Sequence, residues 1–140
     1  MIVDSSAIIA ILRGEPEADE FVRAISSGGC RMSVGSYLEA SIVADSAGSP
    51  ALSRYFDDLV DQAALQLEPV TLEQAQVARQ AYRDYGRGSG HPAGLNFGDC
   101  FAYALARTTR EPLLFKGADF IHTDVLPARR ASTRALPDRQ

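Results

Sequence analysis

The sequence has two cysteines, two histidines and no long hydrophobic run, and each of these shortages excludes a class of protein. Cys30 and Cys100 show no paired spacing and match no CxxC or Cys/His zinc pattern. The apolar stretch at residues 7–12 is too short for a signal-peptide core or a membrane span. No P-loop, GxGxxG or GxSxG motif is present. We therefore expect a cytoplasmic protein with reduced thiols and no membrane segment.

The composition is that of a folded domain, and the charge is unevenly distributed along it. Apolar residues make up 46% and charged residues 23% of 140 residues, which suits one domain with its own hydrophobic core. The net charge is −4, which disfavours a nucleic-acid partner unless bound cations neutralise the acids. Residues 127–140 hold four arginines and one aspartate. We expect a domain over 1–126 and a flexible basic tail over 127–140.

Short apolar segments alternate with amphipathic ones along the chain. Such alternation predicts βαβ units, and thus a mostly parallel sheet of four or five strands flanked by helices. Strands are expected at about 1–3, 31–34, 67–70 and 113–115, and helices at about 6–12, 15–26, 36–47, 51–65, 71–85 and 96–107.

Four acidic residues follow predicted strands or lie in predicted helices that could bring them to one edge of the sheet. Asp4 directly follows the first strand, and Asp119 lies four residues after the strand that ends at Phe115. Asp99 lies in the first turn of a helix, and Glu39 lies inside another. Ligands of open α/β sheets gather at the carboxyl ends of the strands. Convergence of these carboxylates would be costly without a cation, since like charges resist ionising together.

Mg²⁺ or Mn²⁺ would offset that repulsion, because both are hard cations that prefer oxygen ligands. A metal held by carboxylates polarises a phosphoryl oxygen and orients an attacking water, and a second metal would stabilise the leaving oxygen. Phosphodiester hydrolysis needs these effects and no covalent nucleophile. The sequence leaves open whether one or two metal ions act.

Each acid also has an ordinary structural interpretation. Asp4 could cap the first helix. Asn96 and Asp99 have the spacing of a helix cap with an acid in the first turn. Glu39 could be a surface glutamate, and Asp119 a loop acid. Taken singly, none of the four identifies a site.

Taken together, the motifs resemble the PIN domain family, and most closely the VapC-type toxins of bacterial toxin–antitoxin pairs. The resemblance covers residues 1–124 and rests on four features: Asp4-Ser5-Ser6 after the first strand, Glu39 within a helix, Gly94-Leu95-Asn96-Phe97-Gly98-Asp99-Cys100, and Leu-Leu-Phe-Lys-Gly-x-Asp-Phe ending at Phe120. It implies a PIN-like three-layer sandwich. It also implies a toxin of a type II toxin–antitoxin system that acts as a Mg²⁺- or Mn²⁺-dependent endoribonuclease on RNA.

The resemblance also implies roles for individual residues. Asp4 and Asp99 would be the main metal ligands. Glu39 and Asp119 would be the third and fourth acids, which tune the metal or orient the attacking water.

Three further positions match supporting parts of the family pattern. Ser6 matches a small hydroxyl residue that supports Asp4 or the bound water, and Asn96 matches a polar position beside Asp99. Asp124 is an additional acid near the fourth position, and it could share or replace the role of Asp119.

The resemblance further implies a homodimer with the active groove near its seam, and a VapB-type antitoxin whose tail blocks the groove. Arg83 and Arg87 lie beside tyrosines next to the glycine-rich segment 86–94, and they could contact single-stranded RNA or could simply be solvated. Lys116 could contact phosphate or be a solvated lysine at a strand end.

One alternative function remains open, a catalytically silent PIN-like module that binds RNA or protein. A phosphoryl-transfer or receiver domain of the same fold class is disfavoured. A haloacid-dehalogenase-like enzyme would need Asp where Ser6 stands, and a receiver would need paired acids after the first strand and a phosphoacceptor Asp after a central strand, neither of which is evident. Several apolar residues are expected in the core or in a subunit interface: Leu38, Ile42, Phe97, Phe101, Leu105 and Leu113 to Phe115.

Overall fold

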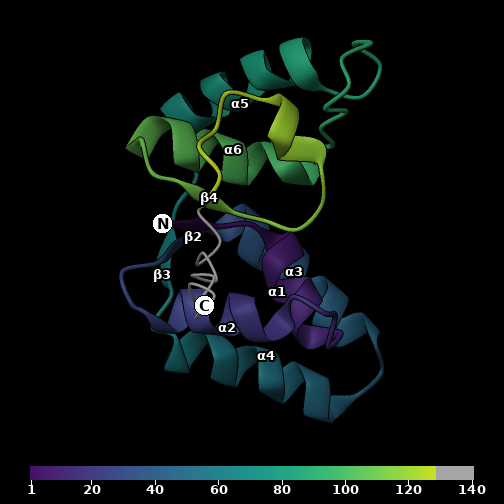
Figure 1. The fold of residues 1–140 in the computed structure, drawn as a ribbon, viewed down its shortest axis with the longest axis vertical. Helices are drawn as coiled ribbons and strands as arrows, with labels where there is room; N and C mark the ends of the chain where they lie inside the picture. The colour runs from purple at the N-terminus through teal and green to yellow at the C-terminus, as the bar shows by residue number, and fades with distance from the viewer. Residues whose placement is uncertain (129–140) are drawn as a thin grey trace, which may run out of the picture.

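The computed structural model describes residues 1–128, and a parallel sheet with the strand order β3-β2-β1-β4 runs through the middle of this region (Figure 1). Its strands are β1 (Ile2–Val3), β2 (Arg31–Ser33), β3 (Gln66–Glu68) and β4 (Leu113–Leu114). Ile2 pairs with Arg31 on one side and with Leu113 on the other. Of the expected basic tail, only residues 127 and 128 lie within the described part of the chain.

Six helices cover the two faces of this sheet. α5 and α6 lie together on one side of the strands, and α1 to α4 lie on the other (Figure 1). This arrangement confirms the predicted α/β sandwich with a mostly parallel sheet. The helices are α1 (Ser5–Leu12), α2 (Ala18–Ser26), α3 (Val34–Ser46), α4 (Pro50–Gln62), α5 (Leu72–Tyr85) and α6 (Phe97–Thr109), and a 3₁₀ turn, η1 (Asp119–His122), follows β4.

Side-chain caps fix where most of these helices begin. Asp4, Ser33, Ser49, Thr71 and Asn96 each accept a hydrogen bond from a backbone N–H two or three residues further on. α3 starts two residues earlier than the sequence predicts because Ser33 caps it. Each cap satisfies an N–H that has no partner inside its helix.

The core has two parts, one on each face of the sheet. Val3 belongs to the part under α1 to α4, where Ile8, Met32 and Phe56 are buried. Ile2 belongs to the part under α5 and α6. Successive residues of a strand point to opposite faces, so even the two-residue β1 contributes to both halves.

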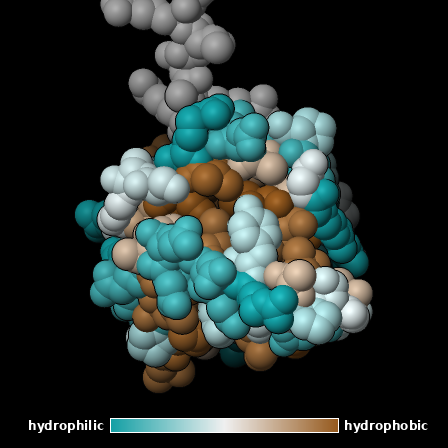
Figure 2. All heavy atoms as spheres, turned by 90° about the horizontal axis from the view of Figure 1, so that it is seen from below, coloured by the Kyte–Doolittle hydropathy of each residue, from teal (hydrophilic) through white to brown (hydrophobic). Residues whose placement is uncertain are grey.

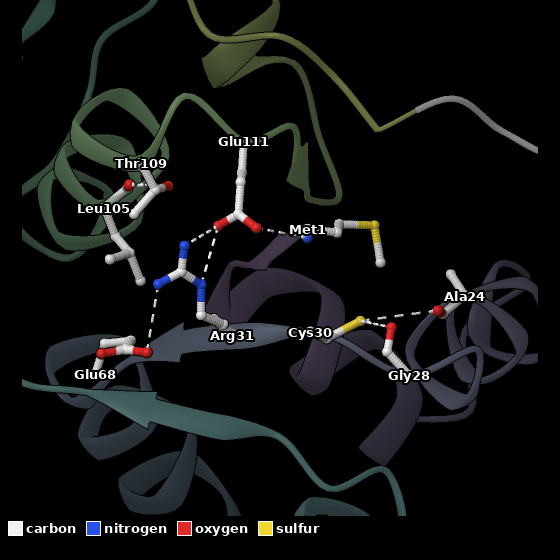
Figure 3. A network of polar contacts seen from close by, with 9 residues as sticks. All are labelled: Met1, Ala24, Gly28, Cys30, Arg31, Glu68, Leu105, Thr109 and Glu111. Atoms are coloured by element: carbon white, nitrogen blue, oxygen red, sulfur yellow. Dashed lines mark hydrogen bonds and ion pairs between the residues drawn. The ribbon is translucent and has the colours of Figure 1, made fainter.

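An ion-pair network centred on Arg31, the first residue of β2, connects neighbouring segments of the sheet (Figure 3). Arg31 Nε and Nη2 donate to Glu111 Oε2 at 3.0 and 2.6 Å, and Arg31 Nη1 lies 3.5 Å from Glu68 Oε1. The amino group of Met1 lies 3.4 Å from Glu111 Oε1. These contacts link the start of β2 to the carboxyl end of β3, to the residue before β1 and to the segment before β4.

On the face seen from below, apolar residues are visible in the centre with polar residues around them (Figure 2). No helix within residues 1–128 is both long and apolar enough to cross a membrane.

Candidate active site

Asp4 is a buried carboxylate at the carboxyl end of β1, and its two oxygens have different roles. The residue is 1% exposed. Its Oδ2 accepts the N–H of Ser6 at 3.0 Å and so caps α1. Its Oδ1 is also buried and has no hydrogen-bond partner. The capping interpretation of Asp4 is therefore correct for one oxygen, and the other oxygen remains available for a ligand.

Asp99 lies in the first turn of α6, in a reciprocal cap with Asn96. The Asn96 side chain accepts the N–H of Asp99 at 2.9 Å, and Asp99 Oδ2 accepts the N–H of Asn96 at 3.0 Å. This capping box fixes the side-chain orientation of Asp99 at the helix N-terminus, where the helix dipole favours a negative charge. As with Asp4, one carboxylate oxygen is used by the cap.

Glu39 reaches the same region from the middle of α3. Ser5 Oγ donates a hydrogen bond to Glu39 Oε1. A Cβ atom on Gly98 would overlap the Glu39 carboxylate, so the absence of a side chain at Gly98 lets α6 approach it. Neither Ser5 nor Gly98 has a role that the sequence predicts. The one sequence feature that could have indicated a role for Gly98 is its position directly before Asp99.

The four acids suggested by the sequence line one pocket of about 340 Å³. Asp4 follows β1, Glu39 comes from α3, Asp99 from α6, and Asp119 from the start of η1. The other lining residues are Ser5, Ser6, Ile9, Val43, Asn96, Lys116 and Phe120. The pocket thus combines residues from four separate segments at the carboxyl edge of the sheet.

Asp124 does not line this pocket. It accepts a hydrogen bond from the Tyr103 hydroxyl at 2.6 Å and lies 3.5 Å from Arg107 Nη2. Of the two candidates for the fourth acid, Asp119 is the one placed beside the other three. Asp124 instead connects the segment after η1 to α6.

Ser6 supports Asp4 through both its hydroxyl and its backbone, because hydrogen bonds from each favour the ionised form of the Asp4 carboxyl and oppose the rise of its pKa. Its N–H donates to Asp4 Oδ2, while its Oγ accepts the backbone N–H of Lys116 at 3.0 Å. The hydroxyl therefore joins the start of α1 to the loop after β4. Both elements contribute residues to the pocket.

Two carboxylates of this pocket, Asp4 and Asp99, are hard to ionise. Burial, with smaller contributions from the charges of Asp99 and Glu39, raises the pKa of Asp4 to about 7. Burial, followed by the charges of Asp119 and Glu39, raises the pKa of Asp99 to about 6, and Arg87 opposes that rise. A cation in the pocket would favour the ionised forms of both groups.

The donor set fits a metal ion bound by few protein ligands. Among residues 1–128, no group of three or more His, Cys, Asp and Glu side chains is arranged to hold a metal ion. Mg²⁺ commonly binds through one or two carboxylates and keeps several waters. Asp4, with an unpartnered buried oxygen, and Asp99 beside it provide such a pair.

Arg83 and Arg87, which were suggested as RNA contacts, lie in different surroundings. Arg83 lines an apolar groove of about 640 Å³ between α5 and α6. Arg87 is close enough to Asp99 to influence its pKa. Lys116 is not a free solvated lysine, because its Nζ is paired with Glu15 and Glu17.

The apolar residues expected in the core or in an interface divide into three groups, of which one, Phe101 and Phe115, is half-buried. Leu105, Leu113 and Leu114 are buried. Leu38, Ile42 and Phe97 are 57%, 54% and 77% exposed, so the core interpretation is wrong for these three.

Comparison with known proteins gives consistent results. The family model for the PIN domain matches residues 1–126. The chain is 58% identical to ribonuclease VapC28 of Mycobacterium tuberculosis, over 89% of this chain and 95% of that protein. It is 53% identical to ribonuclease VapC42 of the same species, over 91% and 98% of the two chains.

Two solved structures share the fold at low sequence identity. Mycobacterium tuberculosis VapC20, described as a sarcin-ricin loop cleaving toxin, superposes with a TM-score of 0.69 at 17% identity, over 91% of this chain and 98% of that one. A toxin–antitoxin complex from Klebsiella pneumoniae gives a TM-score of 0.65 at 16% identity, over 85% and 88% of the two chains.

Proposed function

This chain belongs to the PIN domain family, among its VapC ribonucleases, and we propose that it cleaves RNA with a divalent cation held by Asp4 and Asp99. Its function is that of a toxin endoribonuclease of a toxin–antitoxin pair. The observation that carries the metal proposal is the buried Asp4 Oδ1, which has no hydrogen-bond partner, in a residue that lines a pocket together with three further acids. An unpartnered buried carboxylate oxygen is costly, and a cation offsets that cost.

Within this proposal, the protein's own groups divide the work. Bound Mg²⁺ or Mn²⁺ supplies a Lewis acid for phosphodiester hydrolysis. Asp4 and Asp99 would hold the ion through their carboxylates. Glu39, oriented by Ser5, and Asp119 orient the attacking water and accept its proton. The caps that fix Asp4 and Asp99 reduce the reorganisation needed for reaction.

The pocket chemistry favours this function over a catalytically silent module. Binding RNA needs no buried acids, which would repel its phosphates. Holding a cation does need buried acids, and four acids line this pocket. Their burial and proximity raise the pKa values of Asp4 and Asp99, so the ionised forms are less stable without a cation. A silent module would gain stability by replacing these acids.

The partner that goes with a toxin of this kind is an antitoxin. We propose a VapB-type antitoxin whose basic segment enters the pocket. Four carboxylates and one lysine line that pocket, so a cationic side chain would find complementary charge there. We also propose a cytoplasmic location, since the RNA substrate is found there and both cysteines are free and buried.

We also propose that the protein forms a homodimer, and one surface of the molecule is suited to be its interface. Leu38 and Ile42 of α3 are exposed, as is Phe97 of α6. Phe97 and Phe101 pack edge to face with ring centroids 5.1 Å apart, and both line the α5–α6 groove. Phe101 also packs against Gly35 of α3, which makes the surface continuous. We call this surface the α3–α6 face.

Protruding apolar side chains beside an apolar groove on the same chain can be self-complementary, as a two-fold interface requires. Phe97 lies two residues before Asp99, so such a dimer would place each pocket near the seam. Leu38→Glu should convert a dimer to a monomer in sedimentation, and Leu126→Glu, at an exposed leucine beside β4, should not. A wild-type monomer at micromolar concentration would contradict this part.

The nuclease proposal is tested by metal titration and cleavage with purified variants. Asp4→Asn and Asp99→Asn should abolish Mn²⁺-dependent cleavage of RNA, and EDTA should abolish it in the wild type. Asp58→Asn, at an exposed acid of α4, is the matched control and should cleave normally. Wild-type cleavage by either pocket variant would show that the pocket is not the active site. No cleavage and no Mn²⁺-induced stabilisation in the wild type would favour the silent module.

A further inference from the structure

Lys116 lies at the pocket but is held by acids outside it. It is the one cationic residue among the described residues that line the pocket. Its Nζ pairs with Glu15 and lies 3.2 Å from Glu17 Oε2, both in the segment between α1 and α2. Its backbone N–H donates to Ser6 Oγ at 3.0 Å. Residue 116 is therefore tied to both ends of α1.

We propose that Lys116 is a positioning residue: with Glu15 and Glu17 it forms a clamp that holds the loop after β4 so that Asp119 faces Asp99. The loop is short, because only two residues separate Lys116 from Asp119. Gly117 provides the turn with a φ of +98°, a conformation that favours glycine.

The clamp complements a second anchor at the far end of the same loop. Phe120, directly after Asp119, is buried and packs on Phe115 with ring centroids 5.2 Å apart. The aromatic pair fixes the loop to the core beneath α6. The clamp fixes it to α1, the helix that Asp4 caps. Asp119 lies between the two anchors, so loss of either one should let it move relative to Asp4 and Asp99.

Direct contact of Lys116 with a phosphate is the less favoured role. The ammonium already lies between two carboxylates, and a phosphate would have to displace at least one of them. The carboxylates of Glu15 and Glu17 thus neutralise the Lys116 ammonium and hold it in place. A lysine that binds a substrate phosphate would bind it more tightly with fewer acidic neighbours, because neighbouring carboxylates compete with the phosphate for the ammonium.

This inference rests on the proposed nuclease activity, and it is tested by a double-mutant cycle with the full-length protein. The variants are Lys116→Met, Lys116→Arg, Glu15→Gln with Glu17→Gln, and Asp119→Asn, alone and combined with Lys116→Met. Arg54→Met, at an exposed arginine of α4, is the matched control. Steady-state cleavage gives kcat and KM, and hydrogen exchange of residues 115–120 in metal-free protein gives a readout independent of activity.

Lys116→Met should lower kcat by about 10- to 100-fold and leave KM nearly unchanged, because a misplaced catalytic group slows the chemical step. Removing both glutamate charges should reproduce that loss, and Lys116→Arg should restore most of the rate. In the Asp119→Asn background, Lys116→Met should cause no further loss, since both act through the same group. Exchange of residues 115–120 should accelerate in Lys116→Met and not in Arg54→Met.

Three results would overturn the clamp. One is a loss of kcat in the Lys116→Met, Asp119→Asn double variant that equals the product of the losses in the two single variants. Another is a raised KM at constant kcat, which would assign Lys116 to phosphate binding. The third is unchanged exchange of the loop in Lys116→Met. Failure of the nuclease proposal itself looks different, because Asp4→Asn and Asp99→Asn would then cleave RNA like the wild type while the exchange experiment still reports on the clamp.

Discussion

Replacing Asp4 by Asn should make the metal-free protein more stable at alkaline pH while destroying its activity. The pKa of Asp4 rises from 3.8 to about 7 in the fold, mainly because the side chain is buried. A rise of this size corresponds to about 4 kcal/mol of lost stability when the group is ionised. The sign follows from linkage: the unfolded chain releases this proton first, so stability falls as pH rises from about 4 to about 7 and then levels off.

Asparagine at position 4 removes the buried charge, but it still lowers the stability of the fold through an unpaired amide group. Its side-chain oxygen can still accept the N–H of Ser6 and cap α1. Its amide N–H₂ would replace Asp4 Oδ1, which has no partner, and an unpaired buried donor costs about 1–3 kcal/mol. The net gain near pH 8 in EDTA is therefore about 1–3 kcal/mol, or a rise of about 3–10 °C in Tm.

Thermal unfolding in EDTA across the pH range measures this effect. Near pH 4.5 the charge penalty falls to about 1 kcal/mol while the unpaired amide remains, so the order of the two Tm values should reverse. Asp58→Asn is the control and should follow the wild type throughout. An Asp4→Asn variant that melts at or below the wild-type temperature near pH 8 would refute the reasoning. So would a difference in Tm that does not change with pH.

Four further predictions follow from the same geometry. Gly98→Ala should destabilise the fold by about 1–3 kcal/mol and slow cleavage by about 100-fold, because the new methyl group displaces Glu39. Denaturant unfolding measures the loss of stability and single-turnover cleavage measures the rate. A normal cleavage rate would contradict the role of Glu39. Ser5→Ala should slow cleavage by about 10-fold through loss of the hydrogen bond to Glu39, with an unchanged far-UV spectrum; an unchanged rate would remove Ser5 from the site. Mn²⁺-induced stabilisation should increase from pH 6 to pH 8, since the pKa values of Asp4 and Asp99 are about 7 and 6 and the ligands must be ionised; calorimetry that finds pH-independent binding would exclude these ligands. Arg31→Met should cost about 1–2 kcal/mol of stability and leave the rate unchanged, because neither Arg31 nor its partners Glu68 and Glu111 line the pocket.

The sequence predicted most of the elements because their signals are local. Caps at Thr71 and Asn96 begin the helices expected there. The helix expected from residue 15 begins at Ala18, since Glu15 turns back to donate its N–H to the carbonyl of Ala10. η1 was not expected, because a single 3₁₀ turn carries no periodic pattern.

The exposed apolar residues show where local patterns are insufficient. Leu38 and Ile42 are four residues apart, as in a buried helix face, yet both are more than half exposed. The spacing shows only that they share one face of α3. Whether that face meets the core, a partner or solvent depends on how α3 sits against α1, α4 and α6.

By itself, the sequence determined the order of the strands and α-helices, the caps at Thr71 and Asn96, and the four acids that follow strands or lie in helices. All of these depend on spacing along the chain, which is visible in one dimension. Only the tertiary structure decided that Asp119, and not Asp124, lines the pocket, that Ser5 holds Glu39, and that Lys116 is paired with acids from another segment. Each of these depends on distances between residues far apart in the chain, and such distances exist only once the helices have packed on the sheet.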